Sequence, residues 1–152
     1  MVGAEHRTLV RDMKLALLSE IGARSIYDHL GRHVKDEDLR ALLAQLNGTG
    51  EESVRRLREL MIDLGAQPRT TSLRRRALAR GLALASRVTG VRFALRICMN
   101  AEETVGRWYQ SYGLFLMKLD DPDRARVCQE LSQIKRQHAQ VLGAWVGNLR
   151  RD

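Results

Sequence analysis

The sequence predicts an all-α protein, and three observations support that prediction. Only two of the 152 residues are proline. Leucine, alanine, arginine and glutamate, which favour helices, are abundant along the chain. Apolar residues recur at spacings of three and four over long segments, whereas the alternation typical of strands is absent. We therefore expect four long helices and one short helix in a single domain over residues 1–152.

The first long helix is expected over residues 8–34. Its core-facing stripe has helical spacing and consists of Met13, Leu17, Glu20, Ala23, Tyr27, Leu30 and Val34. Glu20 is the charged member of this otherwise apolar or aromatic stripe. Because a glutamate is rarely buried without a partner, Glu20 is a candidate for a polar site in the core.

The second long helix is expected over residues 36–64. Asp36 is a suitable N-cap, and Gly65 is a suitable residue to end the helix. The stripe of this helix is rich in leucine but has Gly50 and Ser53 near its middle. Each internal glycine costs about 1 kcal/mol in a helix, so we expect one continuous helix, with a kink as the alternative.

A short helix over residues 72–88 follows Pro68 and is expected to join distant ends of the bundle. Gly90 separates it from the third long helix, which is expected over residues 91–118. The stripe of that helix is interrupted by Glu102, much as the first helix is interrupted by a glutamate.

The fourth long helix is expected over residues 122–149. Asp121 is its predicted N-cap, and Pro122 occupies the first helical position, where the missing N–H matters least. The expected stripe consists of Val127, Leu131, Ile134, His138, Val141, Trp145 and Leu149. A histidine therefore lies on the predicted core face of this helix.

The first and third long helices share a spacing. Tyr27 follows Glu20 by seven residues, and Tyr109 follows Glu102 by seven. Seven residues are about two helical turns, so each pair lies on one helix face. This spacing indicates a two-fold pseudo-repeat of helix pairs.

The polar residues of the stripes match part of a known pattern. In ferritin-like di-metal bundles, two helices each supply one glutamate, the other two each supply Glu-x-x-His, and all point into the core. Glu20, Glu102 and His138 occupy positions that this pattern requires. The other three positions, which should hold a glutamate, a histidine and a glutamate, hold Gly50, Ser53 and Lys135.

Two short segments carry a more specific resemblance. Residues 20–27, EIGARSIY, and residues 102–109, EETVGRWY, resemble the first and third helix motifs of the demethoxyubiquinone hydroxylase family. That family is a membrane-associated di-iron branch of the ferritin-like superfamily. Residues 68–70 with residues 81–84 are similar to its crossover region, and the resemblance covers about residues 15–145.

The resemblance implies a ferritin-like antiparallel four-helix bundle with a short crossover helix between the second and third long helices. It also implies that Glu20 and Glu102 correspond to single carboxylate ligands and His138 to the fourth-helix histidine. Three of the six protein ligands of the family are then missing.

We therefore expect a non-catalytic protein with a degenerate di-iron site, associated with a membrane or with an isoprenoid or quinone-like lipid. One alternative is a metal-dependent oxidoreductase, related to that family, which uses the reduced ligand set with iron or manganese. A second alternative is a structural homo-oligomer that pairs through exposed helix faces.

Lys135 suggests what replaces the metal. It lies one helical turn before His138, so its ammonium group is expected to face the space between Glu20 and Glu102. Burying charged carboxylates costs several kcal/mol unless a cation neutralises them. We hypothesise that Lys135 holds a polar core network and that the protein has no cofactor.

Four further residues lie beside this set. Tyr27 and Tyr109 are interpreted as packing residues, since radical chemistry would need a competent metal. Glu51 and Glu52 lie off the stripe of the second helix. In the alternative of a mononuclear metal site, these two carboxylates would turn inward and supply the missing ligands.

The two cysteines, Cys98 and Cys128, are expected to be core thiols. With no signal-like apolar stretch near the start of the sequence, they favour a reducing, cytoplasmic compartment. No segment approaches the roughly 20 apolar residues that a transmembrane helix needs. The expected location is therefore the cytoplasm, with peripheral binding to the inner face of the membrane as a further expectation.

The net charge of +8 is concentrated in one segment. Residues 64–101 contain no aspartate or glutamate but include eight arginines, among them Arg74, Arg75, Arg76, Arg80 and Arg87. The short helix in this segment combines arginines with apolar residues, which suits binding to an anionic membrane surface. The alternative is a solvated crossover whose arginines pair with acidic patches. Nucleic acid ranks last, because aromatic residues are not interleaved with the arginines and no helix-turn-helix pattern is present.

Overall fold

The computed structural model describes residues 3–66, 70–87 and 90–148, and over these residues it contains five α-helices and no strand. The all-α prediction is confirmed. The helices are α1 (Ala4–His33), α2 (Glu37–Asp63), α3 (Thr70–Arg87), α4 (Val91–Lys118) and α5 (Pro122–Asn148). The bounds of α4 are those predicted. The predicted ends of the short and the last helix, Val88 and Leu149, lie outside the described residues.

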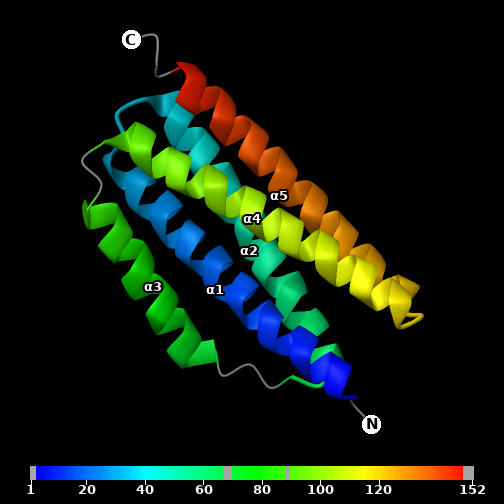
Figure 1. The fold of residues 1–152 in the computed structure, drawn as a ribbon. Helices are drawn as coiled ribbons and strands as arrows, with labels where there is room; N and C mark the ends of the chain where they lie inside the picture. Colours follow the sequence, from blue (N-terminus) through cyan, green and yellow to red (C-terminus); the bar gives the residue numbers. More distant parts are fainter. Residues whose placement is uncertain (1–2, 67–69, 88–89, 149–152) are drawn as a thin grey trace. The chain divides into compact units, whose positions relative to one another are not determined.

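The chain forms two compact units, Met1–Ala83 and Leu84–Asp152. The first contains α1, α2 and most of α3, and the second contains α4 and α5. In each unit two long helices lie side by side and run antiparallel, joined by a short connection (Figure 1). Each unit is therefore one helical hairpin, with α3 added to the first.

The ends of α2 follow the predicted signals. Asp36 accepts a hydrogen bond from the backbone N–H of Leu39, at 3.1 Å, as an N-cap should. Beyond the other end, Gly65 has φ of 90°, a left-handed conformation that glycine adopts without strain. Between these ends α2 is one continuous helix, including its two internal glycines. The prediction of an uninterrupted helix is confirmed.

Small residues bring α3 against α1, which Figure 1 shows alongside it. A Cβ atom on Gly81 would lie 2.8 Å from the backbone oxygen of Gly22 and 2.8 Å from Cβ of Ser25. Ala77, one turn earlier on α3, is buried. Only a residue without a side chain fits at Gly81, so this glycine sets how closely the two helices approach.

A tight turn connects α4 to α5. Asp120 has φ of 58°, and aspartate is one of the few residues that tolerate this left-handed region. Asp121 then accepts a hydrogen bond from the backbone N–H of Arg124, at 3.3 Å, and Pro122 is the first residue of α5. The predicted start of this helix is confirmed.

The predicted core face of α5 is wrong, because the buried side of this helix is rotated about the helix axis from the predicted side. Val127, Ile134 and Trp145 are half-buried rather than buried, and Val141 is exposed. The buried face consists of Ala125, Cys128, Leu131, Ser132, Lys135, His138, Ala139, Leu142 and Val146. Small residues line the contact with α4, and a stripe drawn through the larger apolar side chains missed them.

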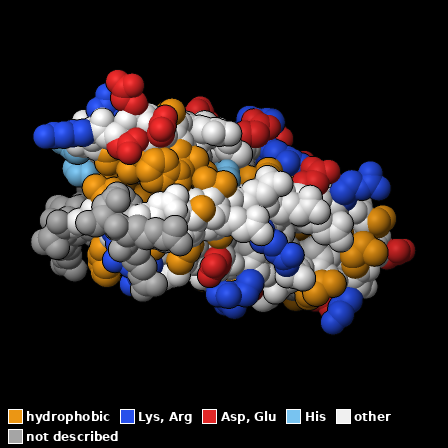
Figure 2. Space-filling view, turned by 90° about the horizontal axis from the view of Figure 1, so that it is seen from above, with side chains coloured by type: hydrophobic (Ala, Val, Ile, Leu, Met, Phe, Trp, Pro, Cys, Tyr) orange, Lys and Arg blue, Asp and Glu red, His pale blue; other side chains and the backbone are white. Residues whose placement is uncertain are grey.

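Charged side chains of both signs are interspersed on the face seen in Figure 2. Some of the exposed charges form helical ion pairs, such as Arg32 with Asp28 at 2.9 Å. Pairs of this kind contribute little to stability because solvent screens them. Over the described residues, none of the helices is apolar over a stretch long enough to cross a membrane.

Candidate functional site: buried charges on two helical hairpins

Three predicted site residues meet in the second unit. The Nζ atom of Lys135 lies 3.1 Å from Oε2 of Glu102, and Nδ1 of His138 lies 3.5 Å from the same oxygen. The side chains of Lys135 and Glu102 are 3% and 2% exposed. One carboxylate oxygen therefore lies between a buried ammonium group and an imidazole, in surroundings that strengthen electrostatic interactions.

The close approach of α4 and α5 is what allows this arrangement. Gly106 lies one turn after Glu102, and a Cβ atom on it would lie 3.3 Å from Cβ of Lys135. The hydroxyl of Ser132 donates a buried hydrogen bond of 2.8 Å to the backbone oxygen of Gly106. The aliphatic part of Lys135 thus passes directly over a glycine, and its ammonium group reaches the glutamate one turn away.

The structure also places the predicted residues of the first unit. Glu20 is 3% exposed on α1, and Ser53 is fully buried on α2. The hydroxyl of Ser53 makes no hydrogen bond with any described residue. Glu20 and Ser53 are therefore buried in the same helical hairpin, one on each of its two long helices.

Gly50 is buried because an arginine side chain crosses it. A Cβ atom on Gly50 would lie 3.0 Å from Cγ of Arg24, so the stem of Arg24 fills the space in which a larger residue would begin. Nε of Arg24 donates a hydrogen bond of 3.0 Å to Oδ1 of Asn47, and Nη2 lies 3.7 Å from Oε2 of Glu51. Position 50, where a ferritin-like site was expected to have a glutamate, therefore holds a glycine that supports an arginine side chain.

The alternative in which Glu51 and Glu52 turn inward is not what the structure describes. The side chain of Glu51 is 74% exposed and faces Arg24. Glu52 is exposed as well and forms an ion pair with Arg55 on the same helix. The Arg55 guanidinium lowers the pKa of Glu52, which keeps that carboxylate charged at the surface.

Two buried tyrosines accompany the glutamates. Tyr27 on α1 and Tyr109 on α4 are both almost fully buried. The rings of Tyr109 and Tyr112 meet edge to face, with centroids 6.1 Å apart. Both tyrosines are thus part of the buried core of their units.

The two thiols are inert core groups by their environment. Burial raises the pKa of Cys98 to about 12, with a smaller contribution from the nearby carboxylate of Glu102. Burial likewise raises the pKa of Cys128 to about 12, with a smaller contribution from Asp121. Both remain protonated at neutral pH and are poor nucleophiles there.

The arginines of α3 form the second predicted site. Arg75, Arg76 and Arg80 are exposed. Arg74 and Arg87 belong to the same helix, but their side chains lie outside the described part of the structure. Leu78 is 40% exposed among these arginines, so α3 presents apolar as well as cationic groups to solvent.

Sequence reasoning missed three residues that shape these sites, namely Arg24, Gly106 and Ser132. A usable signal was present for Gly106, because Gly106 and Gly113 are seven residues apart and both face α5. Within either unit, the residues described include no group of three histidine, cysteine, aspartate or glutamate side chains arranged to hold a metal ion. Comparison with protein-family models, with curated proteins and with solved structures finds no match to this chain.

Proposed function

We propose that this chain is a ferritin-like protein whose di-iron site has been replaced by a charged core network, and that it is not a hydroxylase. The observation that carries the proposal is the buried contact between Lys135 and Glu102, with His138 on the same carboxylate oxygen. These are three of the positions at which ferritin-like bundles place metal ligands.

The donor set does not fit a pair of divalent ions. The ammonium group of Lys135 is a cation already placed against Oε2 of Glu102, an oxygen that a metal would need. Gly50 supplies no donor, and Ser53 supplies only a neutral hydroxyl, whereas iron and manganese sites of this kind are built from carboxylates and imidazoles.

The ammonium group of Lys135 is instead proposed to neutralise buried carboxylate charge, as the metal ions of a di-iron site do. A buried carboxylate without a cation is strongly destabilising, and a lysine with three N–H donors can serve more than one oxygen. Within the second unit, the ammonium group of Lys135 therefore compensates the buried carboxylate of Glu102. His138 completes the network from the next turn of α5.

A double-mutant cycle on Glu102→Gln and Lys135→Met tests that arrangement. Unfolding free energies are measured in urea for the wild type, both single variants and the double variant. If the two groups share one core, their coupling energy is on the order of 1 kcal/mol or more. The matched control replaces Lys135 and the exposed Glu103, which should be additive. Additivity of Glu102 and Lys135 to within about 0.5 kcal/mol would contradict the proposed network.

The second part of the proposal is that α3 binds an anionic membrane surface, through which the protein would reach an isoprenoid or quinone-like lipid. The supporting observation is the exposure of Arg75, Arg76 and Arg80 together with Leu78 on one helix. Each arginine near an anionic surface contributes about 1 kcal/mol, and the leucine adds apolar contact.

Sedimentation with vesicles tests this part. The wild type should pellet with phosphatidylglycerol vesicles and remain in solution with phosphatidylcholine vesicles. Changing Arg75, Arg76 and Arg80 to glutamate should abolish pelleting. The control changes the exposed Arg107, Arg126 and Arg136 to glutamate, which alters the net charge equally. If both variants lose binding to the same extent, the attraction depends on net charge and not on α3.

A further inference from the structure

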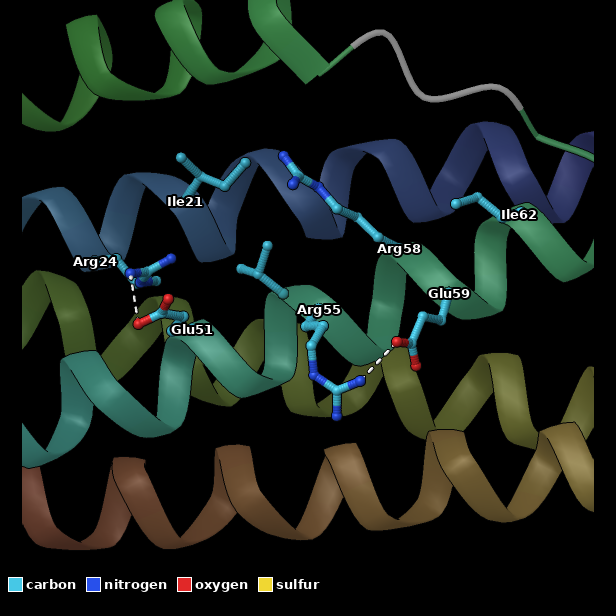
Figure 3. A pocket seen from close by; sticks show the side chains of 8 residues that line it. Ile21, Arg24, Glu51, Arg55, Arg58, Glu59 and Ile62 are labelled. Atoms are coloured by element: carbon cyan, nitrogen blue, oxygen red, sulfur yellow. Dashed lines mark hydrogen bonds and ion pairs between the residues drawn. The ribbon is translucent and has the colours of Figure 1, made fainter.

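A groove of about 350 Å³ lies between α1 and α2, within the first unit. Its lining consists of Ile21, Arg24, Glu51, Val54, Arg55, Arg58, Glu59 and Ile62. Figure 3 shows these side chains converging from the two helices. The volume is near the lower end of the range for small-molecule sites.

Two of the three arginines in this groove already have carboxylate partners. Arg24 lies 3.7 Å from Glu51, and Nη1 of Arg55 lies 2.6 Å from Glu59. Both ion pairs are drawn in Figure 3. These pairs neutralise two of the cationic groups and both carboxylates of the lining.

Arg58 is different. It makes no hydrogen bond or ion pair with any described residue, and its Nε atom is buried without an acceptor. In Figure 3 its side chain extends from α2 toward α1, away from Glu59. A buried N–H without an acceptor is costly, and a guanidinium group offers a planar fork that matches a carboxylate.

The remaining lining residues indicate the polarity and the charge of the ligand that the groove would bind. Ile21 and Val54 are buried, whereas Ile62, one turn after Arg58, is 57% exposed. Among the lining side chains, three arginines and two glutamates leave the positive charge of Arg58 without a partner, while Glu52 outside the lining also pairs with Arg55. A dianion such as a phosphate monoester would be repelled by the carboxylates of Glu51 and Glu59. A monoanion with an apolar tail would instead pair with one arginine and pack its tail against the apolar side chains.

We propose that this groove binds a small monocarboxylate with an apolar tail, its carboxylate on Arg58 and its tail against Ile21, Val54 and Ile62. The site is separate from the buried network of the second unit. It does not depend on the function proposed above.

Titration of the ¹⁵N-labelled protein with octanoate, followed by NMR, tests this inference. Saturable shifts are expected at amides of the groove. Octanol, which lacks the charge, and acetate, which lacks the tail, should both bind more weakly. Arg58→Gln should weaken octanoate binding by at least about tenfold, the effect of losing a charge-assisted hydrogen-bonded pair. Arg32→Gln removes an exposed arginine elsewhere on the same unit and should leave the affinity unchanged.

A second variant guards against a folding defect in the first. Ile62 is largely exposed, so Ile62→Ser should leave the helices intact while reducing the gain in affinity from acetate to octanoate. Wild-type affinity in Arg58→Gln, equal binding of octanol and octanoate, or shifts confined to residues outside the groove would each overturn the proposal.

Discussion

The ammonium group of Lys135 lies 3.1 Å from the carboxylate of Glu102, and both side chains are almost completely buried. Gly106 makes the contact possible because it lets the stem of Lys135 lie directly on α4. Buried ion pairs rarely add net stability over apolar residues of the same size, but removing one partner is costly. The pair is therefore best understood as one unit whose members depend on each other.

Lys135→Met should destabilise the protein by about 3–5 kcal/mol, because it removes the cation from a buried carboxylate. Adding Glu102→Gln to that variant should recover much of the loss, since the uncompensated charge is then gone. Urea unfolding measures both. Lys14→Met, at an exposed position of α1, should change stability by less than about 0.5 kcal/mol. A small effect of Lys135→Met would mean that the ammonium group is not needed in the core.

The two cysteines should not react with an alkylating reagent in the folded protein at pH 8, and both should react after unfolding. Both are fully buried, and burial raises each pKa to about 12. Mass spectrometry of alkylated samples counts the modified thiols. Rapid modification of Cys98 or Cys128 in the native state would contradict their placement in the core.

The same thiols give the protein a dependence on pH. Because their pKa values in the folded state exceed the ordinary value of 9.0, their contribution is fully present below about pH 9 and is lost as the pH rises toward 12. Stability should therefore fall more steeply between pH 8 and 10 in the wild type than in a variant with Cys98→Ala and Cys128→Ala. Equal slopes in urea unfolding would contradict the raised pKa values.

Two glycines, one closely packed and one exposed, test the packing of α3. Gly81→Ala would place a methyl group 2.8 Å from a backbone oxygen of α1, so α3 must shift, at a cost of about 1–3 kcal/mol. Gly48→Ala meets nothing within 4 Å on the exposed side of α2 and should stabilise by about 0.5–1 kcal/mol. Thermal unfolding and hydrogen exchange of α3 distinguish them. Equal effects would contradict the close contact of Gly81.

Much of the helical structure could be predicted from the sequence, because the signals were local. Asp36, Gly65 and Pro122 mark helix ends through the conformations and hydrogen bonds that their own residue types favour. The stripe containing Glu102 was equally clear, since large apolar residues surround it at regular spacing.

What could not be predicted depends on packing between helices. The core face of α5 was drawn through Val127 and Ile134, whereas the structure buries Ala125, Ser132 and Ala139. That rotation follows from the fit of small residues against the glycines of α4, which spacing along one helix does not reveal. The position of Arg24 over Gly50 likewise depends on a neighbouring helix.

The most direct test of the central claim is the metal content of the full chain, purified without chelators from cells grown with added iron and manganese. Elemental analysis should find both metals far below stoichiometric amounts, because the ammonium group of Lys135 occupies the carboxylate that a metal would use. Iron or manganese bound in stoichiometric amount, and lost when Glu102 is changed to alanine, would contradict the account.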